Sequence, residues 1–248
     1  MHIVSAGTYG RYMTSAPSTE PDALGALTAP NSPNNESVGS PMETGPFGSE
    51  LSLAEVTFVV VDLETTGGVP ANCGITEIGA VKVRMGEVQS DFRTFCNPGL
   101  PIPAFITELT GISNAHVESA PTTDIAVQDF LNWAQLSSDH TTVLVAHNAT
   151  FDIGFLLHAC AQHSINWPQP PVLDTLRLAR KVLSREEVPD KKLSTLAAHF
   201  NAPTTPNHRA LDDAMATVTV LHALLERAAG FGVLDPVTLL GYKWSTPK

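Results

Sequence analysis

The chain has 248 residues, 43% of them hydrophobic and 16% charged, and its formal net charge is −11 at pH 7. This composition is typical of a soluble globular protein with a sizeable core. The negative charge excludes a protein that coats long duplexes by neutralising many phosphates. It permits a site that holds only a strand end, because divalent cations invert the local field around acidic side chains.

Cysteine content and hydropathy narrow the class further. The three cysteines, Cys73, Cys96 and Cys160, are widely spaced and form no CxxC pair, which argues against a disulfide framework and against a zinc site. The sequence has no run of about 18 apolar residues and no apolar stretch at its amino terminus. We therefore expect a cytoplasmic protein.

Composition divides the chain into three segments. Residues 1–52 are rich in Pro, Ser, Thr, Asn and Gly and show no period of 2 or 3.6, which predicts a disordered extension. Residues 53–232 carry the apolar patterns of one folded domain, and residues 233–248 form a short carboxy-terminal tail. Met42 lies shortly before the first strong strand, which suggests a translation start downstream of Met1.

Within the domain, three strands come first, and helices and strands then alternate. Runs of β-branched and aromatic residues predict strands at 56–61, 75–84, 87–96, 142–146 and 172–173. Apolar residues at helical spacing predict helices at 104–109, 123–136, 151–162, 175–183, 193–200 and 210–229. This order predicts an α/β domain with a mixed five-stranded sheet flanked by helices.

Asp62 and Glu64 stand two residues apart at the end of the first predicted strand. Residues at that spacing share one face of a strand, so both carboxylates point to the same side. Two neighbouring acids on a central strand repel each other and lose solvation, and a divalent cation offsets both effects. Hard oxygen ligands of this kind suit Mg²⁺ or Mn²⁺. Solvated acids at a strand end are the alternative interpretation of this pair.

Two later clusters carry the other candidate side chains. Asp152 lies in the predicted helix after strand 142–146, where the helix dipole alone also explains an acid in the first turn. His208 and Asp213 are five residues apart, so they would not share a face if both were helical. They converge if His208 lies in the loop before the helix and Asp213 points inward from its first turns. Asp212 is the competing carboxylate.

Taken together and in this order, the clusters resemble the DEDDh exonuclease family, whose members have the ribonuclease H-like fold. The resemblance spans residues 56–225. The residues that match the three motifs of the family are Asp62 with Glu64, Asp152, and His208 with Asp213. The His-x4-Asp spacing of the family selects Asp213 over Asp212, and a histidine in place of tyrosine selects the DEDDh branch.

The resemblance implies a metal-dependent 3′→5′ exonuclease. Its four carboxylates, Asp62, Glu64, Asp152 and Asp213, would hold two Mg²⁺ or Mn²⁺ ions, which clamp the attacking and leaving oxygens of an in-line displacement at phosphorus. A histidine is suited to take a proton from the attacking water near neutral pH, so His208 is the expected general base.

The family also implies contacts to the 3′-terminal nucleotide. The residues expected to make them are Leu63, Thr65, Thr66, Ile112, Asn148 and Phe151. Segment 106–112 resembles a stretch that wedges apolar side chains beside the terminal base; without the resemblance it reads as an amphipathic turn packed on the sheet. Phe155 is more consistent with a core position, and Asp174 with a helix cap that orients its neighbours.

The form Glu64-Thr65-Thr66-Gly67 resembles proofreading exonucleases such as the epsilon subunit of bacterial DNA polymerase III. It favours single-stranded or frayed DNA 3′ ends as substrate, with release of nucleoside 5′-monophosphates, in proofreading or repair beside the polymerase catalytic subunit. A ribonuclease T-like enzyme that trims RNA is the alternative. Residues 233–248 contain no convincing polymerase-binding or clamp-binding peptide, which leaves a stand-alone repair exonuclease open. An inactive protein-binding scaffold is the alternative of another class.

Overall fold

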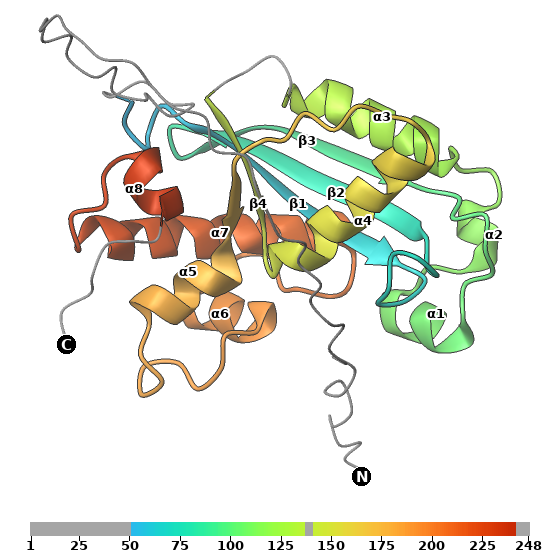
Figure 1. Ribbon diagram of the computed structural model, residues 1–248. Coiled ribbons are helices and arrows are strands. Elements are labelled where there is room, and N and C mark those ends of the chain that lie inside the picture. Colours follow the sequence, from blue (N-terminus) through green and yellow to red (C-terminus); the bar gives the residue numbers. More distant parts are fainter. Residues whose placement is uncertain (1–50, 137–140, 242–248) are drawn as a thin grey trace, which may run out of the picture. The chain divides into compact units, whose positions relative to one another are not determined.

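A mixed sheet of five strands lies at the centre of the structure (Figure 1). The computed structural model describes residues 51–136 and 141–241. The strands are β1 (Thr57–Thr65), β2 (Ile75–Arg84), β3 (Glu87–Phe95), β4 (Thr142–Ala146) and β5 (Val172–Asp174). They lie in the order β3-β2-β1-β4-β5, antiparallel from β3 to β1 and parallel from β1 to β5. The predicted mixed five-stranded sheet is confirmed.

The helices are α1 (Ala104–Thr110), α2 (Asn114–Val117), α3 (Thr123–Ala134), α4 (Ala149–Gln162), α5 (Thr175–Val182), α6 (Leu193–His199), α7 (Ala210–Ala229) and α8 (Pro236–Gly241). They cover both faces of the sheet. Phe58 and Val60 of β1 pack with residues of α5, α6 and α7, whereas Val59 and Val61 pack with α3 and α4. Because β1 is buried on both faces, its sequence is continuously apolar from 58 to 61 rather than alternating.

The amino-terminal end of α7 lies in direct backbone contact with β2. A Cβ atom added to Gly79 of β2 would lie 2.2 Å from the carbonyl carbon of Ala210, the first residue of α7. Only a residue without a side chain permits this approach. The contact fixes the start of α7 over the centre of the sheet.

The structure differs from the sequence-based prediction at two places, the end of β1 and the segment after residue 232. β1 continues four residues past Val61 to Thr65, because pairing with β2 persists to Thr65 opposite Ile75 although the residues there are polar. The predicted tail contains α8, whose Leu239 is buried in the core. Asp235 accepts hydrogen bonds from the Thr238 N–H at 2.8 Å and the Thr238 hydroxyl at 2.7 Å. An aspartate followed by a proline is a signal for the start of a helix. The helix that follows has only six residues, which are too few to show a helical period in the sequence.

The predicted extension 1–52, with the suggested start at Met42, falls almost entirely outside the described residues. Leu51, where the description begins, already packs against the core. Within residues 51–136 and 141–241, no helix combines the length and apolarity needed to span a bilayer.

Candidate active site

The first two candidate carboxylates lie in the central strand. Asp62 and Glu64 are alternate residues of β1, so both project from the face that Phe58 and Val60 share with α7. Glu64 stands opposite Glu77 of β2 in the antiparallel register. β1 therefore presents two acids, and β2 adds a third beside them.

A sharp turn after β4 delivers Asp152 to the same strand. Asn148 adopts a left-handed conformation with φ 70°, and α4 begins at the next residue. The Asn148 N–H donates to the Asp174 carboxylate at 3.1 Å, which holds this turn. Asp152, in the first turn of α4, is 3% exposed and accepts a hydrogen bond from the Leu63 N–H at 3.0 Å. The carboxylate of Asp152 thus contacts β1 at Leu63, the residue between Asp62 and Glu64.

Asp174 is the cap that the sequence predicts. Its carboxylate accepts hydrogen bonds from the Leu176 N–H at 2.9 Å and the Arg177 N–H at 3.3 Å at the start of α5. Since the same oxygen also receives the Asn148 N–H, one side chain starts α5 and shapes the entry to α4.

The loop before α7 supplies the imidazole and the last carboxylate. His208 is exposed and left-handed, with φ 60°, one residue before Arg209, the helix N-cap. Asp213 is buried and accepts the Asn207 N–H at 2.9 Å, whereas Asp212 accepts the side-chain amide of Asn207 at 2.8 Å. His208 therefore lies in the loop, and Asp213 rather than Asp212 points inward, as the sequence predicts.

These segments converge on one group of ligand atoms. Among the described residues, one ligand atom each from Glu64, His208 and Asp213 lie within 4.8 Å of one another. Asp62 and Asp152 stand outside this group of three. Asp62 is nevertheless close enough to Asp152, Asp213 and Glu64 for each of these charges to raise its pKa. Four carboxylates and one imidazole, from positions 62 to 213, thus share one region.

The surroundings of these four carboxyl groups raise their pKa values. Burial, followed by the charges of neighbouring acids, raises the pKa of Glu64 to about 8 and holds that of Asp62 well above its ordinary value. Burial also raises the pKa of Asp152 to about 8 and, in part offset by the Asn207 hydrogen bond, raises that of Asp213. A site with several carboxyl groups whose ionised forms are disfavoured is suited to divalent cations with a preference for oxygen ligands, because the cations stabilise the ionised forms.

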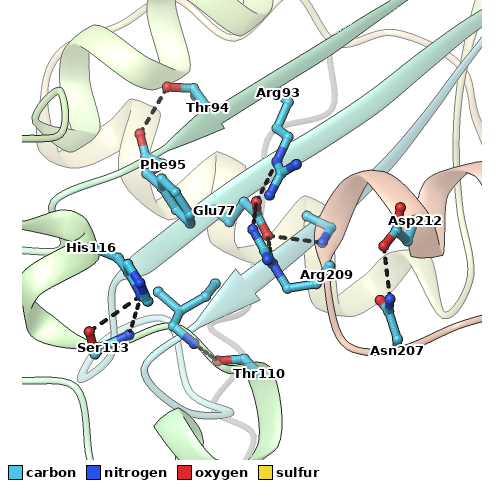
Figure 2. Close-up of polar contacts among 12 residues, drawn as sticks. Glu77, Arg93, Thr94, Phe95, Thr110, Ser113, His116, Asn207, Arg209 and Asp212 are labelled. Carbon is cyan, nitrogen blue, oxygen red and sulfur yellow. Dashed lines mark hydrogen bonds and ion pairs between the residues drawn. The ribbon is translucent and has the colours of Figure 1, made fainter.

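Glu77 behaves differently although it has 0% exposure. Burial raises its pKa, but hydrogen bonds from Arg209, the Ala210 N–H and Arg93 outweigh burial, so the net pKa lies below the ordinary value. Figure 2 shows both guanidinium groups directed at this carboxylate. Sequence reasoning missed Glu77 and Arg209. The available signal was a lone acid in the apolar strand β2, together with an arginine next to His208.

The predicted nucleotide contacts divide into two groups. Thr65 and Thr66 are buried, and their hydroxyls hold the loop after β1: Thr65 donates to the Gly67 carbonyl at 2.7 Å, and the Gly74 N–H donates to Thr66 at 3.0 Å. Leu63 is also buried, at 4% exposure. Asn148, by contrast, is exposed. The two threonine hydroxyls thus stabilise the loop beside the carboxylates through hydrogen bonds within it.

The aromatic and apolar candidates follow the same division. Phe151 is half-buried and packs on Phe155, which is a core residue as expected, with ring centroids 5.0 Å apart. Ile112 is only 1% exposed and belongs to a small apolar cluster with Ile102, Ile106 and Val117. On α1 the exposed apolar side chains are Phe105 and Leu109, at 63% and 51%.

Comparison with known proteins shows the family of this chain. A model of the exonuclease family matches residues 59–221. A putative bifunctional exonuclease/endonuclease protein of Mycobacterium tuberculosis is 53% identical over 200 residues, 78% of this chain and 30% of that protein. A PolC-type DNA polymerase III of Caldanaerobacter subterraneus is 40% identical over 195 residues, 79% of this chain and 13% of that protein. The chain therefore belongs to this exonuclease family, and it spans less than a third of the length of these two relatives.

A solved structure gives the fold class. The nuclease domain of 3′hExo, a DEDDh family member, bound to rAMP, is similar with a TM-score of 0.58. The match has 18% sequence identity and covers 71% of this chain and 94% of that one. The fold is thus the ribonuclease H-like fold expected from the sequence.

Proposed function

We propose that this chain is a metal-dependent 3′→5′ exonuclease that removes nucleoside 5′-monophosphates from DNA 3′ ends. The observation that carries the proposal is the convergence of Glu64, His208 and Asp213 within 4.8 Å, beside the half-buried Asp62 and the buried Asp152. All five side chains have the chemistry that phosphodiester hydrolysis requires.

In this proposal Asp62, Glu64, Asp152 and Asp213 hold two Mg²⁺ or Mn²⁺ ions. When bound, such ions activate water and neutralise the charge that develops on phosphate oxygens. The raised pKa values of the acids supply the physical reason for binding, because a cation stabilises the ionised forms that the fold itself disfavours.

His208 acts as the general base in this proposal. Its exposed position lets it exchange the proton with solvent after each turnover. The left-handed backbone at His208 and the hydrogen bond from Asn207 to Asp213 fix the loop, so the imidazole stays beside the carboxylates.

DNA is the proposed substrate because one of the similar proteins is a DNA polymerase III. This similarity also supports a role in proofreading or repair beside a polymerase catalytic subunit. The alternative is RNA trimming, which the rAMP bound to the similar 3′hExo domain favours.

The test uses matched 20-mer DNA and RNA oligonucleotides labelled at the 5′ end. We expect Mg²⁺ or Mn²⁺ to support stepwise shortening from the 3′ end, and EDTA or Asp62→Asn to abolish it. Asp91→Asn, an exposed acid on β3, is the matched control and should remain active. Activity that survives both EDTA and Asp62→Asn would overturn the site assignment. Faster RNA cleavage would overturn the choice of DNA, and a wild-type protein inert on both substrates would indicate a scaffold.

A further inference from the structure

Cations are unevenly distributed along this acidic chain. Six of its 14 lysines and arginines fall within residues 177–192. They are Arg177, Arg180, Lys181, Arg185, Lys191 and Lys192. This segment covers most of α5 and the connection to α6, which projects as an open loop in Figure 1. A local positive region in a protein of net charge −11 is a candidate site for an anionic partner.

Four of the six cations line one hollow of about 1040 Å³, referred to below as the cationic hollow. Its charged lining consists of Arg180, Arg185, Lys191 and Lys192, with Asp190 as the acid among the described residues. Arg180, Arg185 and Lys192 are exposed to solvent. Their side chains are therefore available to an incoming ligand.

The wall of the cationic hollow is a built structure. The side chain of Lys191 donates to the carbonyl oxygens of Ser184 at 3.0 Å and Val188 at 2.8 Å, which closes the connecting loop on itself. His147 is in contact with both sides of the wall: Nδ1 lies 2.9 Å from the Thr175 hydroxyl, and Nε2 lies 2.9 Å from the Lys191 carbonyl oxygen. These contacts attach the loop to the end of β4.

A neighbouring acid is also neutralised. Glu187 forms an ion pair with Arg227 of α7 and does not line the hollow. Among the residues that line the hollow, Asp190 is the acid beside Arg180, Arg185 and Lys192.

The cationic hollow adjoins the carboxylate cluster. Asn148 lines the hollow and is also the N-cap of α4, whose fourth residue is Asp152. At a rise of about 1.5 Å per residue, these two residues are separated by roughly 6 Å along the helix axis. A strand with its 3′ end at the carboxylates therefore reaches the hollow within its next few nucleotides.

We propose that the cationic hollow binds the phosphodiester backbone of the substrate strand on the 5′ side of the terminal nucleotide. The inference rests on the proposed nuclease function. It would give this acidic protein a positive surface that holds a polyanion next to the cluster of carboxylates. Contacts of this kind bind phosphates regardless of base sequence.

The experiment compares the variant combining Arg180→Gln, Arg185→Gln and Lys192→Gln with the wild type on two substrates. One is a single-stranded 20-mer, and the other is the p-nitrophenyl ester of thymidine 5′-monophosphate, which is too short to reach the hollow. We expect the ratio of kcat/KM for the 20-mer to that for the ester to fall at least about tenfold. The slope of log affinity against log salt should weaken by about 2, or about 0.7 for each lost phosphate contact.

A matched control is Arg84→Gln compared with Arg185→Gln. Both arginines are exposed. Arg84 ends β2 on the side of Phe58, whereas the carboxylates lie near the opposite end of the strand pair, at Thr65. Arg84→Gln should leave the ratio and the salt slope at their wild-type values. An equal effect of the two substitutions would mean that only net charge matters, which would overturn the assigned site.

Binding of the 20-mer by fluorescence anisotropy, on the Asp62→Asn background, separates this inference from the proposed function. If the wild type hydrolyses both substrates and the triple variant keeps the ratio, the affinity and the salt slope, the inference is wrong and the nuclease function stands. If the wild type hydrolyses neither substrate, the nuclease function fails, and an unchanged affinity in the triple variant then removes the hollow as well. Loss of affinity in the triple variant supports the hollow in either case.

Discussion

Arg209 and Glu77 form a two-point ion pair that ties the loop carrying His208 to strand β2. The guanidinium Nε lies 3.1 Å from Glu77 Oε2, and Nη2 lies 2.9 Å from Oε1. The carboxylate also receives the Ala210 N–H at 3.1 Å and Arg93 at 2.8 Å (Figure 2). The side chain of Glu77 has no exposure, whereas that of Arg209 is 30% exposed. Glu77 without Arg209 would therefore be a buried charge, whereas Arg209 without Glu77 could still be solvated by water.

Arg209→Leu should destabilise the protein more than Glu77→Gln. Loss of Arg209 leaves a buried carboxylate with Arg93 as its remaining cation, which costs about 3–5 kcal/mol for a broken buried pair. Loss of the Glu77 charge leaves two arginines that water can reach, and glutamine keeps part of the hydrogen bonding, so we expect about 1–3 kcal/mol. Urea denaturation measures both free energies of unfolding. The reverse order would show that Arg209 does not compensate the charge of Glu77.

His208→Ala should lower kcat by about 10²–10⁴-fold, the range for loss of a general base, while KM changes little. The side chain is exposed, so its removal leaves no cavity and should not alter the unfolding midpoint. Steady-state kinetics from pH 6 to pH 9 test the assignment, and His199→Ala is a control for loss of an imidazole outside the site. Full activity of His208→Ala across this range would disprove the general-base role.

Without metal, the protein should lose stability as the pH rises from about 5 to 8. Glu64 and Asp152 have pKa values of about 8 in the fold, while carboxyl groups in an unfolded chain ionise near pH 4. Between these values the folded state binds more protons than the unfolded state, so the free energy of unfolding falls with increasing pH. Glu77 acts in the opposite sense, since its lowered pKa favours folding above pH about 4.

Thermal unfolding in EDTA and in Mg²⁺ measures this effect. Mg²⁺ binds the ionised carboxylates, so the difference in Tm between the two conditions should be larger at pH 8 than at pH 5. Glu64→Gln should make the profile in EDTA flatter. A Tm in EDTA that rises steadily from pH 5 to 8 would contradict the raised pKa values.

Gly79→Ala should reduce both stability and activity. The new methyl group would lie 2.2 Å from backbone atoms of Ala210, and backbone cannot yield as a flexible side chain does. Relief of this overlap requires the start of α7 to move, at a cost of about 1–3 kcal/mol or more, and His208 and Asp213 would move with it. Gly68→Ala is the control, because a Cβ there meets no atom within 4 Å. Equal melting temperatures for the two variants would refute the contact.

Local patterns in the sequence were sufficient for most elements, because strands and helices longer than about five residues carry their own periodicity. Strand β2 and helix α7 were predicted with the bounds that the structure has. The short helices α2 and α8 were not predicted, since four or six residues do not establish a helical period.

The five proposed catalytic side chains were predicted from the spacing of motifs. The contacts that hold these side chains in place could not be predicted from the sequence. The pairing of Glu64 opposite Glu77 depends on the strand register, which no local pattern specifies. The contact between Glu77 and Arg209 joins residues 132 positions apart. The turn at Asn148 and the inward direction of Asp213 likewise follow from hydrogen bonds to distant or folded backbone.

The position of α7 in the chain also has a consequence for synthesis. All five strands, which end at Asp174, leave the ribosome before the segment that carries His208 and Asp213. A nascent chain can therefore pair its strands while the imidazole and the last carboxylate are still missing. The proposed nuclease activity requires α7 to emerge and dock at Gly79, so the appearance of that activity would report the arrival of this helix on the sheet.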